Sequence, residues 1–134
     1  MLKQKTSTEL ATELPDSAAV ISVGDDNSVF TNLAASLAEI RKLKGVMGYI
    51  LRSDTSAIID LTEQERIIEY AVLSSQISES SIEMAKQFNM ADLESVLVEG
   101  KSVKVLCMSV SENRISVFME KSATHAWIIK RILL

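Results

Sequence analysis

The sequence has one cysteine, one proline, one histidine and four glycines in 134 residues. A single cysteine cannot form a disulfide within the chain. Cys107 also lies in the apolar run 103–110, where a thiol usually acts as a small buried hydrophobe. One histidine and one cysteine do not supply the ligand set of a zinc site. We therefore expect no metal and no cofactor, and the lack of disulfides predicts a reducing, cytoplasmic setting.

Charge and hydropathy exclude further classes. Lys and Arg number 14 against 18 Asp and Glu, which gives a net charge of −4 without a basic stripe for nucleic acid. No apolar run approaches the roughly 18 residues of a membrane span, and residues 1–13 lack the apolar stretch of a signal peptide. Segment 45–48 has two glycines but no Gly-Lys-Ser/Thr ending, so we expect no phosphate-binding loop.

Catalytic residues are not predicted. His125 would need Cys107, a serine or a carboxylate arranged around it by the fold, and we interpret it as a first-turn residue of a C-terminal helix. Trp127 on the same helix is either an exposed contact for a partner or half-buried core, and the burial habits of tryptophan favour core. The chain is not expected to be an enzyme.

Two other groups of residues have a functional and a structural interpretation. Arg41, Lys42 and Lys44 form a small basic cluster that would suit an acidic partner, although a solvated helix end is the commoner case. Four methionines of the domain would line an adaptable surface or fill the core, and we expect core: Met84, Met90, Met108 and Met119.

Hydrophobic periodicity predicts three helices and five strands. The first helix ends at Gly45, a hairpin turns at Ser53-Asp54-Thr55, and Thr62 and Glu65 have the spacing of a capping box for a long helix from residue 63. The predicted order is helix 28–44, strands 46–52 and 56–61, helix 63–87, strands 92–99, 102–110 and 114–120, and helix 122–134.

The long helix is apolar on two sides, with serines between them. One stripe contains Ile68, Ala71, Val72, Ser75, Ile82 and Ala85, and the other contains Leu73, Ile77, Met84 and Phe88. A helix of this kind is typical of one placed between its own sheet and a second element. Because serine is small, we expect a partner helix to approach closely there.

The element order predicts an α+β domain over residues 28–134. Its antiparallel sheet of five strands would carry the long helix on one face and the two terminal helices on the other. Residues 1–27 form a partly flexible N-terminal extension in this interpretation. Its apolar patch 18–23 is suited to pairing as an edge strand.

Residues 28–134 resemble the Roadblock family, also called the dynein light-chain roadblock type, which is related in fold to longin and profilin-like domains. The resemblance rests on the element order, on segment 43–49, on the hairpin around Asp54 and on the Gly100-Lys101 turn. It implies a dimer in which the long helix and the next strand of two subunits lie side by side. The dimer interface predicted on this basis is Ala71, Ser74, Ser75, Ser78, Ser81, Ile82, Leu93, Ser95 and Leu97.

Roadblock domains act as scaffolds or regulators of Ras-like GTPases. The resemblance therefore implies a non-catalytic module, paired with itself or with a homologous Roadblock subunit, that regulates or scaffolds a small Ras-like GTPase. An alternative is a structural dimerisation subunit or assembly factor of a larger complex without a GTPase partner. A small-molecule sensor is a third alternative, although no cluster of convergent polar residues marks a pocket.

Overall fold

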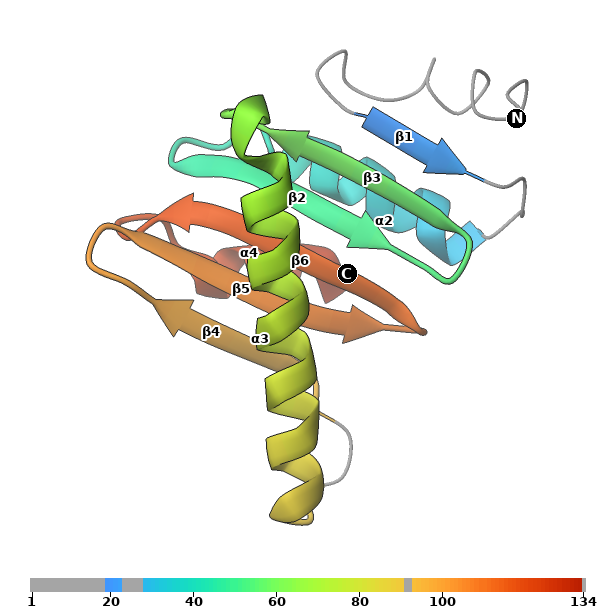
Figure 1. The fold of residues 1–134 in the computed structure, drawn as a ribbon. Helices are drawn as coiled ribbons and strands as arrows, with labels where there is room; N and C mark the ends of the chain where they lie inside the picture. The colour runs from blue at the N-terminus through green and yellow to red at the C-terminus, as the bar shows by residue number, and fades with distance from the viewer. Residues whose placement is uncertain (1–18, 23–27, 91–92, 134) are drawn as a thin grey trace.

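The computed structural model describes residues 19–22, 28–90 and 93–133. Its elements follow the predicted order, with one additional strand at the start and one 3₁₀ turn before the long helix (Figure 1). They are β1 Ala19–Ser22, α2 Ser28–Ile40, β2 Val46–Arg52, β3 Ser56–Leu61, η1 Gln64–Arg66, α3 Ile67–Gln87, β4 Ser95–Glu99, β5 Val103–Val110, β6 Asn113–Glu120 and α4 His125–Leu133.

The strands form one antiparallel sheet in the order β1-β3-β2-β6-β5-β4. Five of them are the predicted strands. The predicted start of β4 at residue 92 is wrong by at least two residues, because residues 93 and 94 belong to no strand and β4 begins at Ser95, while residue 92 itself lies outside the described residues. The sixth, β1, comes from the apolar patch of the N-terminal extension and pairs with β3. The rest of residues 1–27 lies outside the described part, so the division at residue 27 stays a prediction.

Each face of the sheet is covered by helix, which produces two hydrophobic clusters. Helices α2 and α4 lie behind the sheet in Figure 1, and α3 crosses its front. The cluster under α2 and α4 includes Leu37, Tyr49, Leu51, Val117 and Ile128. The cluster under α3 is smaller and consists of Ile50, Leu61, Tyr70, Val105, Cys107 and Phe118. Both faces of β6 are therefore buried, because its alternating side chains enter different clusters.

A tight turn fixes the register of β5 and β6. Ser111 and Glu112 have φ values of 47° and 67°, which match the two central positions of a type I′ hairpin turn. Neither residue is glycine, so each bears the cost of a left-handed conformation. Asn113 offsets part of this cost, because its Nδ2 donates hydrogen bonds to the carbonyl oxygens of Val110 and Ser111, both at 3.2 Å.

The predicted end of the first helix is wrong by four residues. Helix α2 ends at Ile40 instead of continuing to residue 44. The chain then turns tightly, because the guanidinium of Arg41 bonds inward to Asp60 and to the carbonyl oxygen of Val46. Gly45 still adopts a positive φ of 89°, but within this turn and not as the cap of the helix.

The predicted capping box at the start of the long helix is also wrong. Thr62 Oγ1 donates to the carbonyl oxygen of Met47 at 2.9 Å and accepts from Arg41 Nη2 at 2.8 Å, so it does not cap a helix. The backbone N–H of Thr62 still pairs with β2, at 2.8 Å from the Met47 carbonyl oxygen. The chain makes the turn η1 before α3 begins at Ile67, and no side-chain cap is formed.

The other ends agree more closely. Helix α3 ends at Gln87 as predicted, and α4 begins at His125, three residues after the predicted start. Among the described residues, no helix is long and apolar enough to cross a membrane.

Candidate protein-interaction surface

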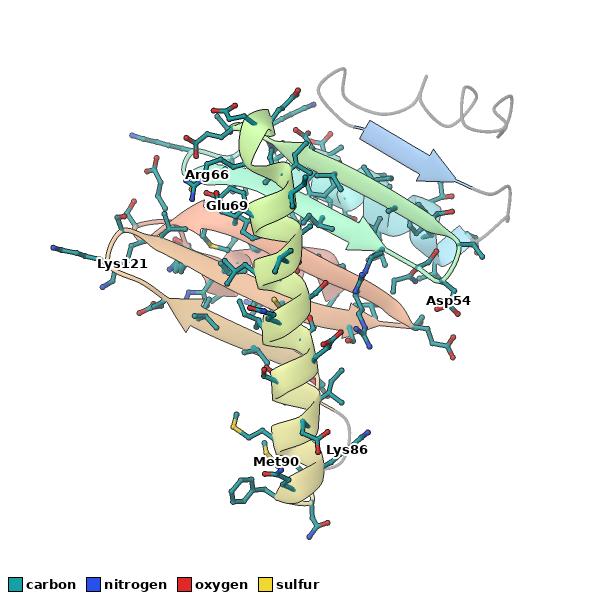
Figure 2. The ribbon with its side chains drawn as sticks, in the orientation of Figure 1. Asp54, Arg66, Glu69, Lys86, Met90 and Lys121 are labelled. Carbon is teal, nitrogen blue, oxygen red and sulfur yellow. The ribbon has the colours of Figure 1, made fainter. Side chains whose placement is uncertain are left out.

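The buried residues of helix α3 run from Tyr70 in its first turns to Ala85 near its end. Tyr70 lies over Phe118 of β6, with ring centroids 4.7 Å apart and planes tilted by 43°. The guanidinium of Arg66 lies over the Tyr70 ring, 5.0 Å from its centroid, and its Nε donates to the carboxylate of Glu69 (Figure 2). These contacts fix the direction in which α3 crosses the strands.

The serines of α3 that were predicted to meet a partner face largely inward. Ser74 and Ser81 are buried, and their hydroxyls donate to the carbonyl oxygens of Ala71 and Ile77 in the same helix. Ser78 is partly buried and lines the same small hollow as Cys107. Their small size therefore lets α3 approach its own sheet.

The other predicted interface residues differ in burial and in the hydrophobic cluster that they contact. Ala71 is half-buried and packs on the cluster under α3, and Ser75 is half-buried. Leu97 of β4 packs against the opposite cluster, under α2 and α4. Ser95, also on β4, is exposed.

A small hollow brings five of the nine predicted residues together. It has a volume of about 20 Å³ and lies where α3 passes over β4 and β5. Its walls include Ser78, Ser81, Ile82, Leu93 and Ser95. The hollow does not include Ala71, Ser74, Ser75 or Leu97. The structure therefore brings together only those predicted interface residues that lie near β4.

Large apolar side chains are exposed in the last turn of α3 and just after its end at Gln87. Met84 is 57% exposed, Phe88 71% and Met90 58%, although core residues were expected at the two methionines. Met108 and Met119 are buried as predicted. Figure 2 shows Met90 at the far end of α3, where the helix has passed beyond the sheet. We refer to Met84, Phe88 and Met90 as the α3 tip.

Strand β4 next to the tip is the last strand of the sheet. It pairs with β5 only, so its other edge offers backbone N–H and C=O groups that no described strand uses. Val98 on this strand is 42% exposed. A free edge and an apolar helix end thus lie at the same side of the domain (Figure 1).

Sequence reasoning missed the α3 tip because it took the serines as the contact face. The available signal was length. A helix of 21 residues spans about 31 Å, whereas five adjacent strands span only about 19 Å between the outer axes. A helix of this length that crosses the strands has to extend past the sheet, and apolar residues at its end then mark an interaction surface.

Cys107 and His125, the two residues considered for catalysis, both contact other side chains of the domain. Cys107 is buried, and burial raises the pKa of its thiol, while hydrogen bonds with Ser116 and Ser78 partly oppose the rise. A protonated, enclosed thiol is a poor nucleophile. His125 is in the first turn of α4, as predicted, and its Nδ1 lies 3.1 Å from Nζ of the buried Lys104. No group of three potential metal ligands occurs among the described residues.

Two other interpretations change with the structure. Trp127, expected to be half-buried core, is 47% exposed, because the inner side of α4 is formed by Ile128 and Ile132. The basic cluster at 41–44 is not simply a solvated helix end, because Arg41 forms an ion pair with the fully buried Asp60. Lys42 and Lys44 are exposed.

Comparison with known proteins identifies the architecture. No family model matches the sequence, and no curated protein matches it either. Among solved structures, a Roadblock/LC7 domain from Streptomyces avermitilis is similar with a TM-score of 0.61 and 15% identity, over 82% of this chain and 90% of that chain. MglB of Myxococcus xanthus is similar with a TM-score of 0.61 and 16% identity, over 82% of this chain and 86% of that chain.

The chain is therefore a Roadblock-type domain by fold. The element order, the antiparallel sheet and the placement of α3 opposite α2 and α4 agree with the predicted fold. At 15% and 16% identity the likeness establishes this fold and no more.

Proposed function

We propose that the protein is a non-catalytic, cytoplasmic module that dimerises through the α3 tip and the free edge of β4. The dimer would regulate or scaffold a small Ras-like GTPase. The observation that carries the dimer is the apolar α3 tip beyond the sheet edge, where Phe88 alone is 71% exposed. An exposed apolar surface of this kind is uncommon on a monomeric protein.

The geometry favours a second copy of this chain as the occupant. If two β4 edges pair antiparallel, the sheet continues into the second subunit. Each α3 tip would then lie over the strands of the other subunit instead of in water. A two-fold arrangement uses the same surface twice, which suits an element that has both a free edge and an apolar extension.

Only some of the nine interface residues predicted from the sequence belong to the proposed dimer contact. Ile82, Leu93 and Ser95 lie beside the tip at the β4 end of α3. Ser74, Ser78 and Ser81 act from within the subunit, because they set the distance between α3 and its sheet. We therefore place the centre of the contact at Met84, Phe88 and Met90.

Light scattering on the purified chain tests the dimer. We expect a mass near twice 14.7 kDa, and a monomer for the double variant Met84→Asp/Phe88→Asp, because a charge in an apolar interface costs several kcal/mol. Ile68→Asp is the matched control, since Ile68 is 79% exposed at the other end of α3, and this variant should remain dimeric. A monomeric wild-type protein at 100 μM would contradict the proposal.

The GTPase partner rests on the fold, because Roadblock domains serve such GTPases. Calorimetry with a Ras-like GTPase from the same organism, loaded separately with GDP and with a non-hydrolysable GTP analogue, tests it. We expect binding in at least one nucleotide state, and weaker binding by the monomeric double variant. Stable dimers that bind no such GTPase in either state would favour the structural dimerisation subunit instead.

A further inference from the structure

A groove lies on the face of the sheet opposite α3, between α4 and the turn that joins α2 to β2 (Figure 1). Its volume is about 230 Å³, and its lining residues are Leu43, Lys44, Val46, Ala123, Thr124, Trp127 and Ile128. The buried side chains of Val46 and Ile128 form its floor. Leu43, 36% exposed, and Trp127, 47% exposed, stand above that floor. We call this the α4 groove.

The two walls of the groove are held together by the backbone. The N–H of Glu120 donates to the carbonyl oxygen of Gly45 at 2.7 Å, and the N–H of Ala123 donates to that of Glu120 at 3.0 Å. Gly45 fits closely against Ala123, because a Cβ at position 45 would lie 3.3 Å from the Ala123 Cβ. The groove is thus formed before any partner arrives, which lowers the entropic cost of binding.

The charge around the groove is opposite to that of the whole protein. Segments 40–46 and 121–134, which supply both walls, contain no Asp or Glu, although Glu39 and Glu120 border them. They contain six Lys and Arg, of which Arg41 pairs with Asp60 and Lys42 with Glu39. A protein with a net charge of −4 therefore presents a cationic region around an exposed tryptophan.

Several of these cations are available to a partner. Lys44 lines the groove, Lys121 precedes α4, and Lys130 and Arg131 follow Trp127 by one helical turn. Within the part of the chain that the structure describes, none of the four has a carboxylate at ion-pair distance. Figure 2 shows Lys121 pointing away from the end of the sheet.

We propose that the α4 groove binds a segment of a partner protein in which one or two apolar side chains are flanked by carboxylates. An apolar side chain of the partner enters the groove against Trp127, Leu43 and Ile128. The carboxylates pair with Lys44 on one wall and with Lys130 and Arg131 on the other. This surface is separate from the α3 tip, so it serves a partner other than the second subunit.

The size of the groove argues against two other occupants. Pockets for small molecules usually have volumes of about 300–1,000 Å³ and a few convergent polar groups. This groove has about 230 Å³, and Lys44 and Thr124 are the polar side chains among its lining residues. A membrane surface would need a broad apolar face, but the apolar side of the nine-residue α4 is buried on the core. A concave groove with a tryptophan wall and a cationic rim is instead typical of the centre of a protein interface.

The test begins with selection from a displayed library of random 12-residue peptides against the full chain, with removal of peptides that also bind Lys44→Glu/Trp127→Ala. We expect the enriched peptides to combine Leu, Phe or Ile with Asp and Glu. Trp127 is the only tryptophan, so its emission reports binding of an enriched peptide directly. We expect a shift to shorter wavelength and weaker binding at higher salt.

Variants locate the contact. Anisotropy of a labelled enriched peptide should show about tenfold weaker binding to Trp127→Ala and to Lys44→Glu, a size typical of a central interface residue. Phe88→Ala on the α3 tip is the control and should bind within twofold of wild type. Equal binding by all variants, enrichment of basic peptides, or no enrichment would each overturn the proposal.

Two measurements without peptide test whether a second copy of the chain or a membrane occupies the α4 groove. Trp127 emission should stay constant when the protein is diluted and when vesicles of phosphatidylcholine and phosphatidylglycerol are added. A shift on dilution would assign the groove to a second copy of the chain, and a shift with vesicles would assign it to an anionic membrane. Either shift would overturn the proposal, because the proposed occupant is a segment of another protein.

Discussion

Arg41 and Asp60 join the end of α2 to β3 by an ion pair, with Arg41 Nε 3.3 Å from Asp60 Oδ1. Asp60 is completely buried, and the same guanidinium also donates to the carbonyl oxygen of Val46 and to Thr62 Oγ1. One side chain therefore ties the helix to two strands. This network replaces both the glycine cap and the threonine cap that local sequence predicts.

Asp60→Asn should destabilise the domain by about 2–3 kcal/mol. Removal of one member of a buried ion pair costs about 3–5 kcal/mol, and the Arg41 side chain is 23% exposed, which lowers the cost through solvent screening. Urea unfolding followed by circular dichroism measures the change. Asp54→Asn in the exposed hairpin is the control and should shift stability by less than about 0.5 kcal/mol. Equal midpoints for the two variants would contradict the role of the pair.

Tyr49 should make the protein sensitive to alkali. Burial, and secondarily the nearby Asp60 carboxylate, raises the pKa of Tyr49 from 10.0 to about 12. The protonated Tyr49 hydroxyl contributes fully to the stability of the folded state below pH 10. This contribution is lost between pH 10 and 12, because the unfolded chain releases the hydroxyl proton at a lower pH than the folded protein does. The loss should be about 1.4 kcal/mol per pH unit, measured as the difference between wild type and Tyr49→Phe. Parallel curves for the two proteins over this range would sink the idea.

Tyr49→Phe should also be well tolerated at neutral pH. The Tyr49 hydroxyl is buried and has no hydrogen-bond partner in the described part of the chain. Removing an unsatisfied buried hydroxyl leaves stability unchanged or raises it by about 1 kcal/mol. A loss of more than about 1 kcal/mol in urea unfolding at pH 7 would show that the hydroxyl contributes a bond after all.

Gly48→Ala should destabilise the sheet strongly. A Cβ at this position would overlap the carbonyl oxygen of Asp60 and lie 2.7 Å from Leu61 Cα, and both are backbone atoms that cannot turn aside. The register of β2 against β6 shifts between Val46 and Gly48, so the glycine belongs to an irregularity in a central strand. We expect a loss of about 3 kcal/mol or more in the same assay, within the range of severe core overpacking.

Gly100→Ala is the matched comparison for Gly48→Ala. Gly100 is exposed in the β4–β5 turn, where an added Cβ would have one close neighbour, the carbonyl oxygen of Val103 at 3.1 Å. This variant should lose clearly less stability. A larger loss at Gly100 than at Gly48 would contradict the steric argument.

The Cys107 thiol should react only when the domain opens. It is buried under α3, and its pKa is raised by that burial. Alkylation by iodoacetamide at pH 8, followed by mass spectrometry, should be at least about 100-fold slower in buffer than in 8 M urea. A folded protein that reacts as fast as the unfolded chain would mean that α3 leaves the sheet readily.

Much of the fold could be predicted from the sequence because the signals are local. Strands 46–52 and 56–61 were located at their observed bounds, since two β-rich runs joined by a polar three-residue turn indicate a hairpin by themselves. The C-terminal end of α3 was located equally well. The order of elements then limited the architecture, because each apolar face has to be covered.

Helix starts and ends were less predictable because distant residues compete for the capping groups. Thr62 has the right spacing for a cap, but β2 and Arg41 use its hydroxyl. Gly45 has the right conformation for a helix end, yet Arg41 turns the chain earlier. No local pattern reveals that Asp60 lies opposite Tyr49 on the neighbouring strand, in reach of that arginine.

The sequence by itself determined the class of the protein: an α+β chain without a basic stripe, with one thiol and a long helix apolar on two sides. Only the tertiary structure decided which of those sides is free. Ser74 and Ser81 of α3 are buried, whereas Met84 and Phe88 are exposed. Periodicity shows which residues share a face of a helix, but exposure depends on what packs against that face and where the sheet ends.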